Sequence, residues 1–512
     1  MKETEGKNRK RTAQQPENAA RQLSETEKKW RARSRELKKD NRILTKSKQM
    51  TFVTWVFGIL FFGMIGYMSY FLLVDANKVS NNAYNVRLQD QENSVYRGKI
   101  LASDGEVLAQ TILTDSGEKV RQYTHGPVFA HVIGYSTVGM TGVEKLANQY
   151  LLKADNSNIL QDLYQEVTGE QYVGCTVVTT LDTSLQETAY SMLGDNQGAV
   201  VALDPSTGKI LAMVSKPDYD PNTIRDIWEE LINSDNGDSR LVNRATQGLY
   251  PPGSTFKLLT ALEYLRENPD YDGGVLFNCT GELDYNGQVI HCSEGAVHGP
   301  MSVRTALEQS CNGFFATIGA TLSPTGFRNT CEDFLFNEKL PVDFEYKKSS
   351  FSLDSDSSEW DQMQVSFGQG TTLATPLQMA LVASSVANGG TMMTPYVLDS
   401  VLDGEGNEIK KFLPKSCANP MTAEEAEQLK SYMTSVVSDG TGYMAQSDSY
   451  QAAGKTGSAE YDSTGNTHAW FIGFAPAENP QIAVAVIVEG GGSGGHVAAP
   501  IAKALFDNYL LR

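Results

Sequence analysis

A run of 24 residues without a charged side chain, from Thr51 to Val74, constrains this 512-residue chain more than any other feature. An apolar helix of this length spans the hydrocarbon core of a bilayer with some tilt, whereas uncharged runs this long are rare in soluble cores. A polar stretch of 50 residues precedes the run, which is too long for an ordinary secretory signal. The sequence therefore predicts one transmembrane anchor at residues 51–74 and a location in a cell membrane.

Charge differs on the two sides of this anchor. Residues 1–50 contain 16 Lys and Arg against 7 Asp and Glu, whereas the whole chain has a net charge of −18. Because basic flanks stay cytoplasmic, we expect a single-pass protein with a cytoplasmic N-terminus and an acidic extracytoplasmic body after Asp75. We interpret residues 1–50 as a disordered or loosely helical basic tail that acts as a topology signal, with contact to anionic lipids as the alternative. Its position beside a membrane segment argues against a nucleic-acid partner.

Two segments follow the anchor. Residues 75–180 contain short extended runs, among them a hairpin with an Asp104-Gly105 turn, and we interpret them as a linker and small pedestal. Residues 181–512 form the predicted main domain, with β-hairpins at both ends and helical runs between and after them. Helices packed on the faces of such a sheet predict an α/β or α+β sandwich.

One stretch of the main domain predicts a nucleophile. Pro252 and Gly253 break regular structure just before Ser254, and good helix formers follow Lys257, which predicts a helix with Ser254 in its first turn. Residues i and i+3 share one helical face, so Lys257 can reach the Ser254 hydroxyl. A desolvated, neutral lysine amine can act as the base for a serine, and a helix N-terminus favours developing negative charge. An ordinary capped helix has the same pattern.

Two shorter motifs lie downstream. Ser310 and Asn312 follow a helical run, and their hydroxyl and carboxamide can point into one cleft, to relay a proton and to bind a substrate amide. A Gly-rich strand edge can approach a ligand closely, offer a backbone N–H to an oxyanion and hold a carboxylate. The residues of that strand are Lys455, Thr456, Gly457 and Ser458. The plain alternatives are a capped turn at Ser310 and a strand with an exposed lysine.

The residues just ahead of that strand suggest no chemistry. Ser438-Asp439-Gly440-Thr441-Gly442 has the composition of a surface turn, and we interpret it as one.

Cysteine and histidine patterns predict neither a metal nor a cofactor. The six cysteines all follow Asp75, where disulfides are possible, and Cys279 with Cys292 is the candidate pair. Their spacings do not match a zinc site, and the histidines are scattered without a His-Glu-x-x-His motif. We interpret each histidine as structural.

The three motifs together, in this order, are more specific than each alone. Ser-x-x-Lys, Ser-x-Asn and Lys-Thr-Gly, starting at Ser254, Ser310 and Lys455, resemble the active-site set of penicillin-binding proteins and serine β-lactamases. The short pedestal and the run Val200 to Asn222 look most like the A-type short members of the class B penicillin-binding proteins, which are found mainly in Gram-positive bacteria. Further runs resemble the class B penicillin-binding proteins in general, over roughly residues 90–512. These runs are Arg97-Gly98, Asp104-Gly105, Asn243-Arg244-Ala245, Phe367-Gly368-Gln369-Gly370, Thr375-Pro376-Leu377-Gln378-Met379-Ala380 and Ala387-Asn388-Gly389-Gly390.

The resemblance implies a peptidoglycan D,D-transpeptidase whose domain has a central antiparallel sheet between helices. It implies that Ser254 attacks the D-Ala-D-Ala carbonyl of a stem peptide while Lys257 takes its proton. D-Alanine then leaves, protonated through Ser310 with Lys455 nearby, and Asn312 orients the acyl chain. An amine from a second stem peptide releases the acyl-enzyme, and β-lactams form an acyl-enzyme that hydrolyses slowly.

The resemblance also assigns the binding groups. The backbone N–H groups of Ser254 and Ser458 hold the oxyanion, and the hydroxyls of Thr456 and Ser458 bind the terminal carboxylate. The family more often has Thr where this chain has Ser458, but the hydroxyl and the backbone N–H remain.

Other activities share these motifs. A D,D-carboxypeptidase differs only in using water as the acceptor, and the sequence leaves it open. A membrane-anchored β-lactam sensor would need a signalling domain, which the 50-residue tail lacks, and a β-lactamase would rarely have this anchor and pedestal. The 106 residues of the pedestal segment are too few for a glycosyltransferase domain, so we expect lipid-linked precursor to be polymerised by a separate membrane glycan polymerase.

Overall fold

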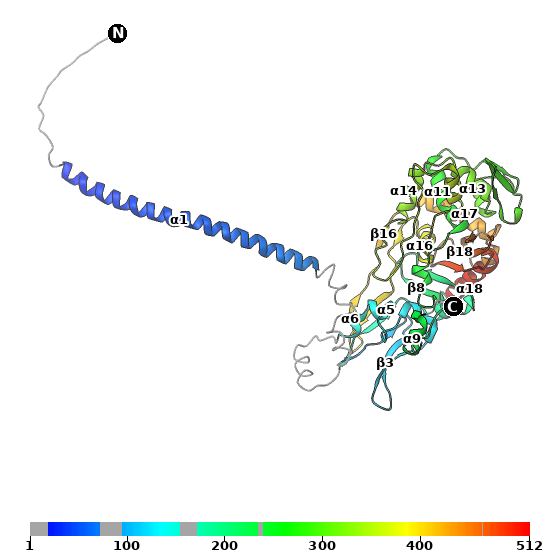
Figure 1. Cartoon of the computed structure of the whole chain (residues 1–512), viewed down its shortest axis with the longest axis horizontal. Helices are drawn as coiled ribbons and strands as arrows, with labels where there is room; N and C mark the ends of the chain where they lie inside the picture. Colours follow the sequence, from blue (N-terminus) through cyan, green and yellow to red (C-terminus); the bar gives the residue numbers. More distant parts are fainter. Residues whose placement is uncertain (1–18, 72–94, 154–171, 234–238, 463) are drawn as a thin grey trace, which may run out of the picture. The chain divides into compact units, whose positions relative to one another are not determined.

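The computed structural model describes residues 19–71, 95–153, 172–233, 239–462 and 464–512, and it separates the chain into two compact units, Met1–Ser80 and Asn81–Arg512 (Figure 1). In the first unit, helix α1 spans Ala19–Tyr70, and its segment Lys48–Tyr70 is long and apolar enough to cross a membrane. The basic tail is thus helical from Ala19 onward, which agrees with the helical one of the two forms that we expected and not with the disordered one. The predicted end of the anchor at Val74 lies outside the described residues.

A five-stranded antiparallel sheet, ordered β17-β18-β19-β7-β8, forms the centre of the second unit. Its strands are β7 (Gly198–Leu203), β8 (Ile210–Lys216), β17 (Ala453–Glu460), β18 (Thr467–Ala475) and β19 (Ile482–Val488). Every residue of β7 and β19 is buried, so both faces of the sheet are covered. The two hairpins predicted from the sequence are therefore neighbours in one sheet, with β19 paired to β7.

Helices cover the two faces of this sheet. Neighbouring residues of a strand point to opposite faces, and Val200 and Val201 accordingly lie in two different cores. The core around Val200 includes residues of α8 (Thr183–Leu193) and α18 (Ala499–Leu510), and the core around Val201 includes α16 (Pro376–Ala387). This confirms the predicted sandwich of a central antiparallel sheet between helices.

The remaining helices of the second unit are mostly short. The α-helices are α4 (Ala130–Ile133), α5 (Gly142–Leu146), α6 (Asn148–Leu151), α9 (Ile224–Asn233), α10 (Arg244–Gln247), α11 (Lys257–Glu267), α12 (Val303–Glu308), α13 (Asn312–Gly319), α14 (Pro324–Asp333), α15 (Glu359–Ser366) and α17 (Ala423–Ser438). Tighter or wider turns of helix are η2 (Gly126–Phe129), η3 (Gly253–Phe256), η4 (Ser293–Gly295), η5 (Tyr443–Ala445) and η6 (Gly494–Ala498).

A second sheet crosses the boundary that we drew at residue 180. It has six strands in the order β15-β14-β6-β2-β3-β4, and two of them, β14 and β15, come from the predicted main domain. The strands are β2 (Ile100–Leu101), β3 (Val107–Leu113), β4 (Lys119–Tyr123), β6 (Thr176–Thr179), β14 (Leu398–Leu402) and β15 (Glu408–Lys411). The pedestal therefore shares a hydrogen-bonded sheet with the larger domain.

Smaller two-stranded ladders complete the second unit. They pair β1 (Val95–Tyr96) with β5 (Tyr172–Val173), β9 (Phe277–Cys279) with β12 (Gly299–Met301), β10 (Glu282–Tyr285) with β11 (Gln288–His291), and β13 (Met392–Met393) with β16 (Ser416–Ala418).

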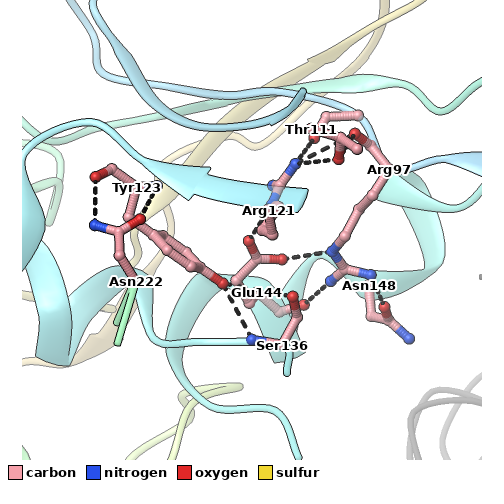
Figure 2. A network of polar contacts seen from close by, with 9 residues as sticks. Arg97, Thr111, Arg121, Tyr123, Ser136, Glu144, Asn148 and Asn222 are labelled. Atoms are coloured by element: carbon pink, nitrogen blue, oxygen red, sulfur yellow. Dashed lines mark hydrogen bonds and ion pairs between the residues drawn. The ribbon is translucent and has the colours of Figure 1, made fainter. Parts of the chain in front are cut away.

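A buried ion network holds the pedestal together (Figure 2). The carboxylate of Glu144 lies between two guanidinium groups, 2.6 Å from Arg97 Nε and 2.7 Å from Arg121 Nε. Burial acts to raise the pKa of Glu144, but the charges and hydrogen bonds of Arg121 and Arg97 outweigh it and hold the pKa below its usual value. The glutamate therefore stays ionised at neutral pH. Removing one partner would leave an uncompensated buried charge.

Asn222, from the chain beyond β8, hydrogen-bonds to the last residue of β4 in the pedestal. The Asn222 carboxamide accepts a hydrogen bond from Tyr123 N at 2.8 Å and donates one to Tyr123 O at 2.9 Å (Figure 2). These two bonds attach the end of β4 to a side chain of the larger domain. The pedestal therefore contacts the larger domain here as well as through the shared sheet.

Candidate active site

The predicted nucleophile lies on a turn pressed against the edge of the central sheet. Ser254 is in η3, directly before α11, as the sequence predicted. Gly253 has φ +54°, and a Cβ there would lie 2.8 Å from the Cβ of Ala459 on β17, so only glycine fits without displacement. Two hydrogen bonds fix the turn, from Gly253 N to Gly368 O at 2.9 Å and from Trp470 Nε1 to Pro251 O at 3.1 Å.

Lys257 is completely buried and contacts the Ser-x-Asn motif. Its amine donates to Ser310 O at 2.7 Å and to Asn312 Oδ1 at 2.6 Å. We expected this amine to reach the Ser254 hydroxyl, but among the described residues no hydrogen bond joins the two. Both strong contacts of Lys257 go to the other motif, and catalytic hydrogen bonds often form only once substrate is bound.

The Ser310 hydroxyl connects the two lysines. Lys455 Nζ donates to Ser310 Oγ at 2.9 Å, and Lys257 Nζ lies 3.4 Å from the same oxygen. Ser310 has φ +57°, a conformation that residues other than glycine rarely adopt and that tends to occur at functional sites. Cys311 caps α13 and Asn312 is the first residue of that helix, so Ser310 is not the helix cap of the plain alternative.

Burial changes the charge state of both amines. Desolvation lowers the pKa of Lys257 from 10.5 to about 7, and it outweighs the charges of Cys311 and Cys292, which act in the opposite direction. Desolvation and the neighbouring Lys257 charge lower the pKa of Lys455 well below its usual value. Two ammonium groups around one hydroxyl repel each other, which disfavours the state with both amines protonated, so a neutral amine is available near pH 7.

The rest of the Lys-Thr-Gly strand lies on β17, which is an edge strand of the central sheet. Gly457 is buried against the nucleophile turn, because a Cβ there would lie 3.1 Å from Thr255 Cγ2. Ser458 is exposed, and its hydroxyl accepts a hydrogen bond from Gly494 N at 3.3 Å. In the part of the chain that the structure describes, β17 pairs with β18 alone, so the backbone groups on its outer edge have no strand partner there. Such an edge suits the binding of an extended peptide.

One residue of this region was missed at the sequence level. The hydroxyl of Thr441 lies 2.6 Å from that of Thr456, within the run that we interpreted as a surface turn without chemistry. Thr441 N also donates to Glu308 O at 3.1 Å, which places it beside the end of α12. The turn is therefore part of the candidate site, and no local pattern in the sequence indicates the contact.

The structure thus brings together residues from four distant parts of the chain. Ser254 and Lys257 come from η3 and α11, Ser310 comes from the turn before α13, and Asn312 is the first residue of that helix. Thr441 comes from the turn after α17, and the third motif comes from β17. A buried nucleophile turn, a lysine with a lowered pKa and a relaying hydroxyl are the groups that acyl transfer requires.

Comparison with known proteins agrees with this arrangement. The family model described as penicillin binding protein transpeptidase domain matches residues 198–507, and the one described as penicillin binding protein A dimerisation domain matches residues 97–177. The second match falls on the segment that we interpreted as the pedestal.

Individual relatives are similar over most of their length. The peptidoglycan D,D-transpeptidase PbpA of Mycolicibacterium smegmatis is 33% identical over 450 residues, which cover 82% of this chain and 90% of PbpA. The peptidoglycan D,D-transpeptidase MrdA of Acinetobacter baumannii is 31% identical over 450 residues, 77% of this chain and 66% of MrdA. The imipenem acyl-enzyme structure of penicillin-binding protein A from M. tuberculosis has a TM-score of 0.74 and 30% identity, over 82% of this chain and 100% of that one. The chain therefore belongs to the class B penicillin-binding proteins.

Proposed function

We propose that this protein is a peptidoglycan D,D-transpeptidase that works through an acyl-enzyme on Ser254. The observation that carries the proposal is the chain of contacts from Lys257 through the Ser310 hydroxyl to Lys455, buried beside the Ser254 turn. The relatives named above are peptidoglycan D,D-transpeptidases, and the solved penicillin-binding protein A is an acyl-enzyme with a β-lactam, which is the chemistry that we assign here.

In the acylation step, neutral Lys257 acts as the base. A neutral amine has two N–H donors and one lone pair. Ser310 O and Asn312 Oδ1 accept those two hydrogen bonds, so the lone pair remains for the proton of the Ser254 hydroxyl. Ser254 then attacks the carbonyl between the two D-alanines of a stem peptide, and the backbone N–H groups of Ser254 and Ser458 hold the oxyanion.

The leaving group needs a proton when the peptide bond breaks. Ser310 Oγ lies between the two lysine amines, so it can give its proton to the departing D-alanine and regain one from the proton taken up at Lys257. The departing amine is thereby released neutral, and the site returns to its starting protonation. An amine from a second stem peptide then attacks the acyl-enzyme by the reverse path.

The terminal carboxylate of the donor peptide binds at β17. The hydroxyls of Thr456 and Ser458 are its donors, and Thr441, 2.6 Å from Thr456, orients the first of these. Lys455 adds positive charge when protonated. Asn312 Oδ1 accepts from Lys257, and Asn312 Nδ2 donates one N–H to His291 O at 2.8 Å, so the second N–H of Nδ2 binds the amide of the acyl chain.

We assign a membrane-anchored location with a cytoplasmic N-terminus and an extracytoplasmic catalytic unit. The candidate span at Lys48–Tyr70 and the basic residues before it support this orientation. The donor is then the stem peptide of a lipid-linked precursor or of nascent glycan, and a separate membrane polymerase supplies the glycan strands.

The test uses the purified full chain with a stem peptide ending in D-Ala-D-Ala and an amine acceptor. We expect release of D-alanine together with a cross-linked amide, and we expect both to be lost in Ser254→Ala but kept in Ser293→Ala, an exposed serine outside the site. Release of D-alanine with only the hydrolysed peptide would identify a carboxypeptidase. Binding of β-lactam without turnover of either peptide would favour a sensor.

A further inference from the structure

Three cysteines and one histidine converge at the Ser-x-Asn motif. We call these residues the thiol cluster, and they are Cys279, Cys292, His298 and Cys311. The sulfur atoms of Cys279 and Cys292 lie 3.6 Å apart, those of Cys292 and Cys311 lie 3.8 Å apart, and Cys279 Sγ lies 3.3 Å from His298 Nδ1. All four atoms lie within 4.8 Å of one another, and the three cysteines are buried.

These distances match the edges of a tetrahedron around one metal ion. Zinc bonds thiolates at about 2.3 Å and imidazole nitrogen at about 2.0–2.1 Å, so a tetrahedral site has about 3.8 Å between sulfurs and about 3.6 Å between sulfur and nitrogen. A disulfide requires sulfurs about 2.05 Å apart. The structure therefore does not form the Cys279–Cys292 disulfide that we considered from the sequence, and Cys292 is as close to Cys311 as a shared ion would place it.

Backbone groups are arranged to stabilise thiolates. Gly281 N donates to Cys279 Sγ and Phe314 N donates to Cys311 Sγ, each at 3.4 Å. Gly281 has φ +95°, and its carbonyl accepts from Cys292 N at 2.9 Å, so the turn after Cys279 brings the next cysteine back to the first. Donors aimed at the ligand atoms are the outer shell that metal–thiolate sites use.

We propose that the thiol cluster is a structural Zn²⁺ site. Three sulfurs and one imidazole in a closed tetrahedron are the ligand set of structural zinc, and the soft sulfurs disfavour Mg²⁺ and Ca²⁺. On binding, the three thiols release three protons to solvent and His298 binds as the neutral ring, which leaves the filled site with a net charge of −1. We predicted no metal from the sequence, because 12, 5 and 12 residues separate the four ligands, unlike the short spacings of familiar zinc motifs.

The ion would fix the position of the Ser-x-Asn motif. Cys311 lies between Ser310 and Asn312, so a bond from its sulfur to the metal ties this turn to β9 and to the residues after β11. Asn312 Nδ2 already donates to the carbonyl of His291, the residue before Cys292, at 2.8 Å. This consequence for catalysis rests on the proposed function, whereas metal binding does not.

Metal content of the full chain, purified in detergent without chelator or metal-affinity steps, tests the site. We expect one zinc per chain by elemental analysis and loss of that zinc in Cys279→Ser and Cys292→Ser. Cys417→Ser is the matched control, because its sulfur contacts Met392 O outside the cluster, and it should keep its zinc. Should the cluster variants fail to fold, thiol modification of the unaltered chain should release one zinc.

Two results would overturn the site. One is a Cys279–Cys292 disulfide found by peptide mapping in chain purified without reductant. The other is reduced chain that keeps no zinc after equilibration with the metal and removal of the excess. Replacement by Co²⁺ gives an independent reading, since a tetrahedral thiolate site produces intense visible bands and an octahedral oxygen site does not.

The positioning role has its own readout. Removing the zinc should slow acylation by benzylpenicillin about tenfold or more, as loss of supporting groups typically does in such sites, and restoring zinc should restore the rate. An unchanged rate in the zinc-free chain would refute the positioning role while leaving the metal site in place. No acylation of the zinc-loaded chain would instead refute the proposed function.

Discussion

Lowering the pH from 8 to 6 should slow acylation of this protein by a β-lactam about tenfold, because the pKa of Lys257 lies at about 7. The amine takes the proton of Ser254 only in its neutral form. As the pH falls through the pKa, Lys257 becomes an ammonium and the base is lost. The logarithm of the acylation rate should therefore rise with slope one below pH 7 and level off above it.

The size of the effect follows from burial. Lys257 is 0% exposed, and the fall of its pKa from 10.5 to about 7 corresponds to about 5 kcal/mol of unfavourable charge burial. A lysine with the ordinary pKa would be neutral in about one molecule in 3,000 at pH 7, whereas Lys257 is neutral in about half. Stability should change with pH in the same direction as activity. Between pH 7 and 10.5, Lys257 is protonated in the unfolded chain but mostly neutral in the folded protein, so the unfolded chain binds more protons. The contribution of Lys257 to the free energy of unfolding therefore becomes less unfavourable as the pH rises.

The assay is the second-order rate of benzylpenicillin acylation by stopped-flow fluorescence between pH 5.5 and 9, with thermal melting at each pH to confirm that the fold persists. His468 is the matched control, since it stacks on Tyr461 near the site and burial lowers its pKa from 6.5. The His468→Phe variant should keep the profile of the unaltered chain. A flat profile between pH 6 and 8, or a profile that disappears in His468→Phe, would refute the assignment of Lys257 as the base.

Three further substitutions probe other parts of the structure. Gly253→Ala places a methyl group 2.8 Å from the Cβ of Ala459 at a residue with φ +54°. The variant should unfold with about 1–2 kcal/mol less free energy in melting experiments and should be labelled by penicillin more slowly. Labelling at the normal rate would contradict the tight turn. Thr441→Val removes the hydroxyl beside Thr456 and should raise KM for a D-Ala-D-Ala peptide by about 2–10-fold with kcat little changed, a split that steady-state kinetics would detect. Glu144→Gln leaves two buried guanidinium groups without their carboxylate and should lower the unfolding free energy by about 3–5 kcal/mol in denaturant melts, while the acylation rate of the folded fraction stays the same.

The parts of the fold that the sequence predicted are those with local causes. The hairpins at β7–β8 and β18–β19 follow from apolar runs separated by turn residues, and α8 begins where Asp182 caps it, with Leu185 N donating to the carboxylate at 2.8 Å. The three motifs of the candidate site are short enough to be recognised from spacing alone, and their order along the chain indicated the family.

The parts that the sequence did not predict depend on contacts between distant residues. Pairing of Leu398 with Thr179 adds β14 to the pedestal sheet, and no local pattern at either strand specifies the partner. The contact between Thr441 and Thr456 arises because two separate elements meet at β17.

One expected hydrogen bond, from the Lys257 amine to the Ser254 hydroxyl, is not seen among the described residues. Helical spacing brings Lys257 near Ser254, but it does not reveal that Ser310 and Asn312 occupy its donors.

The role of Ser254 as the nucleophile of a penicillin-binding transpeptidase is best tested by the intact mass of the chain after incubation with benzylpenicillin. We expect one added penicillin per chain, stable for hours, on the peptide that contains Ser254, and none on Ser254→Ala. An equal adduct on the variant, or no adduct on the unaltered folded chain, would show that Ser254 is not the nucleophile.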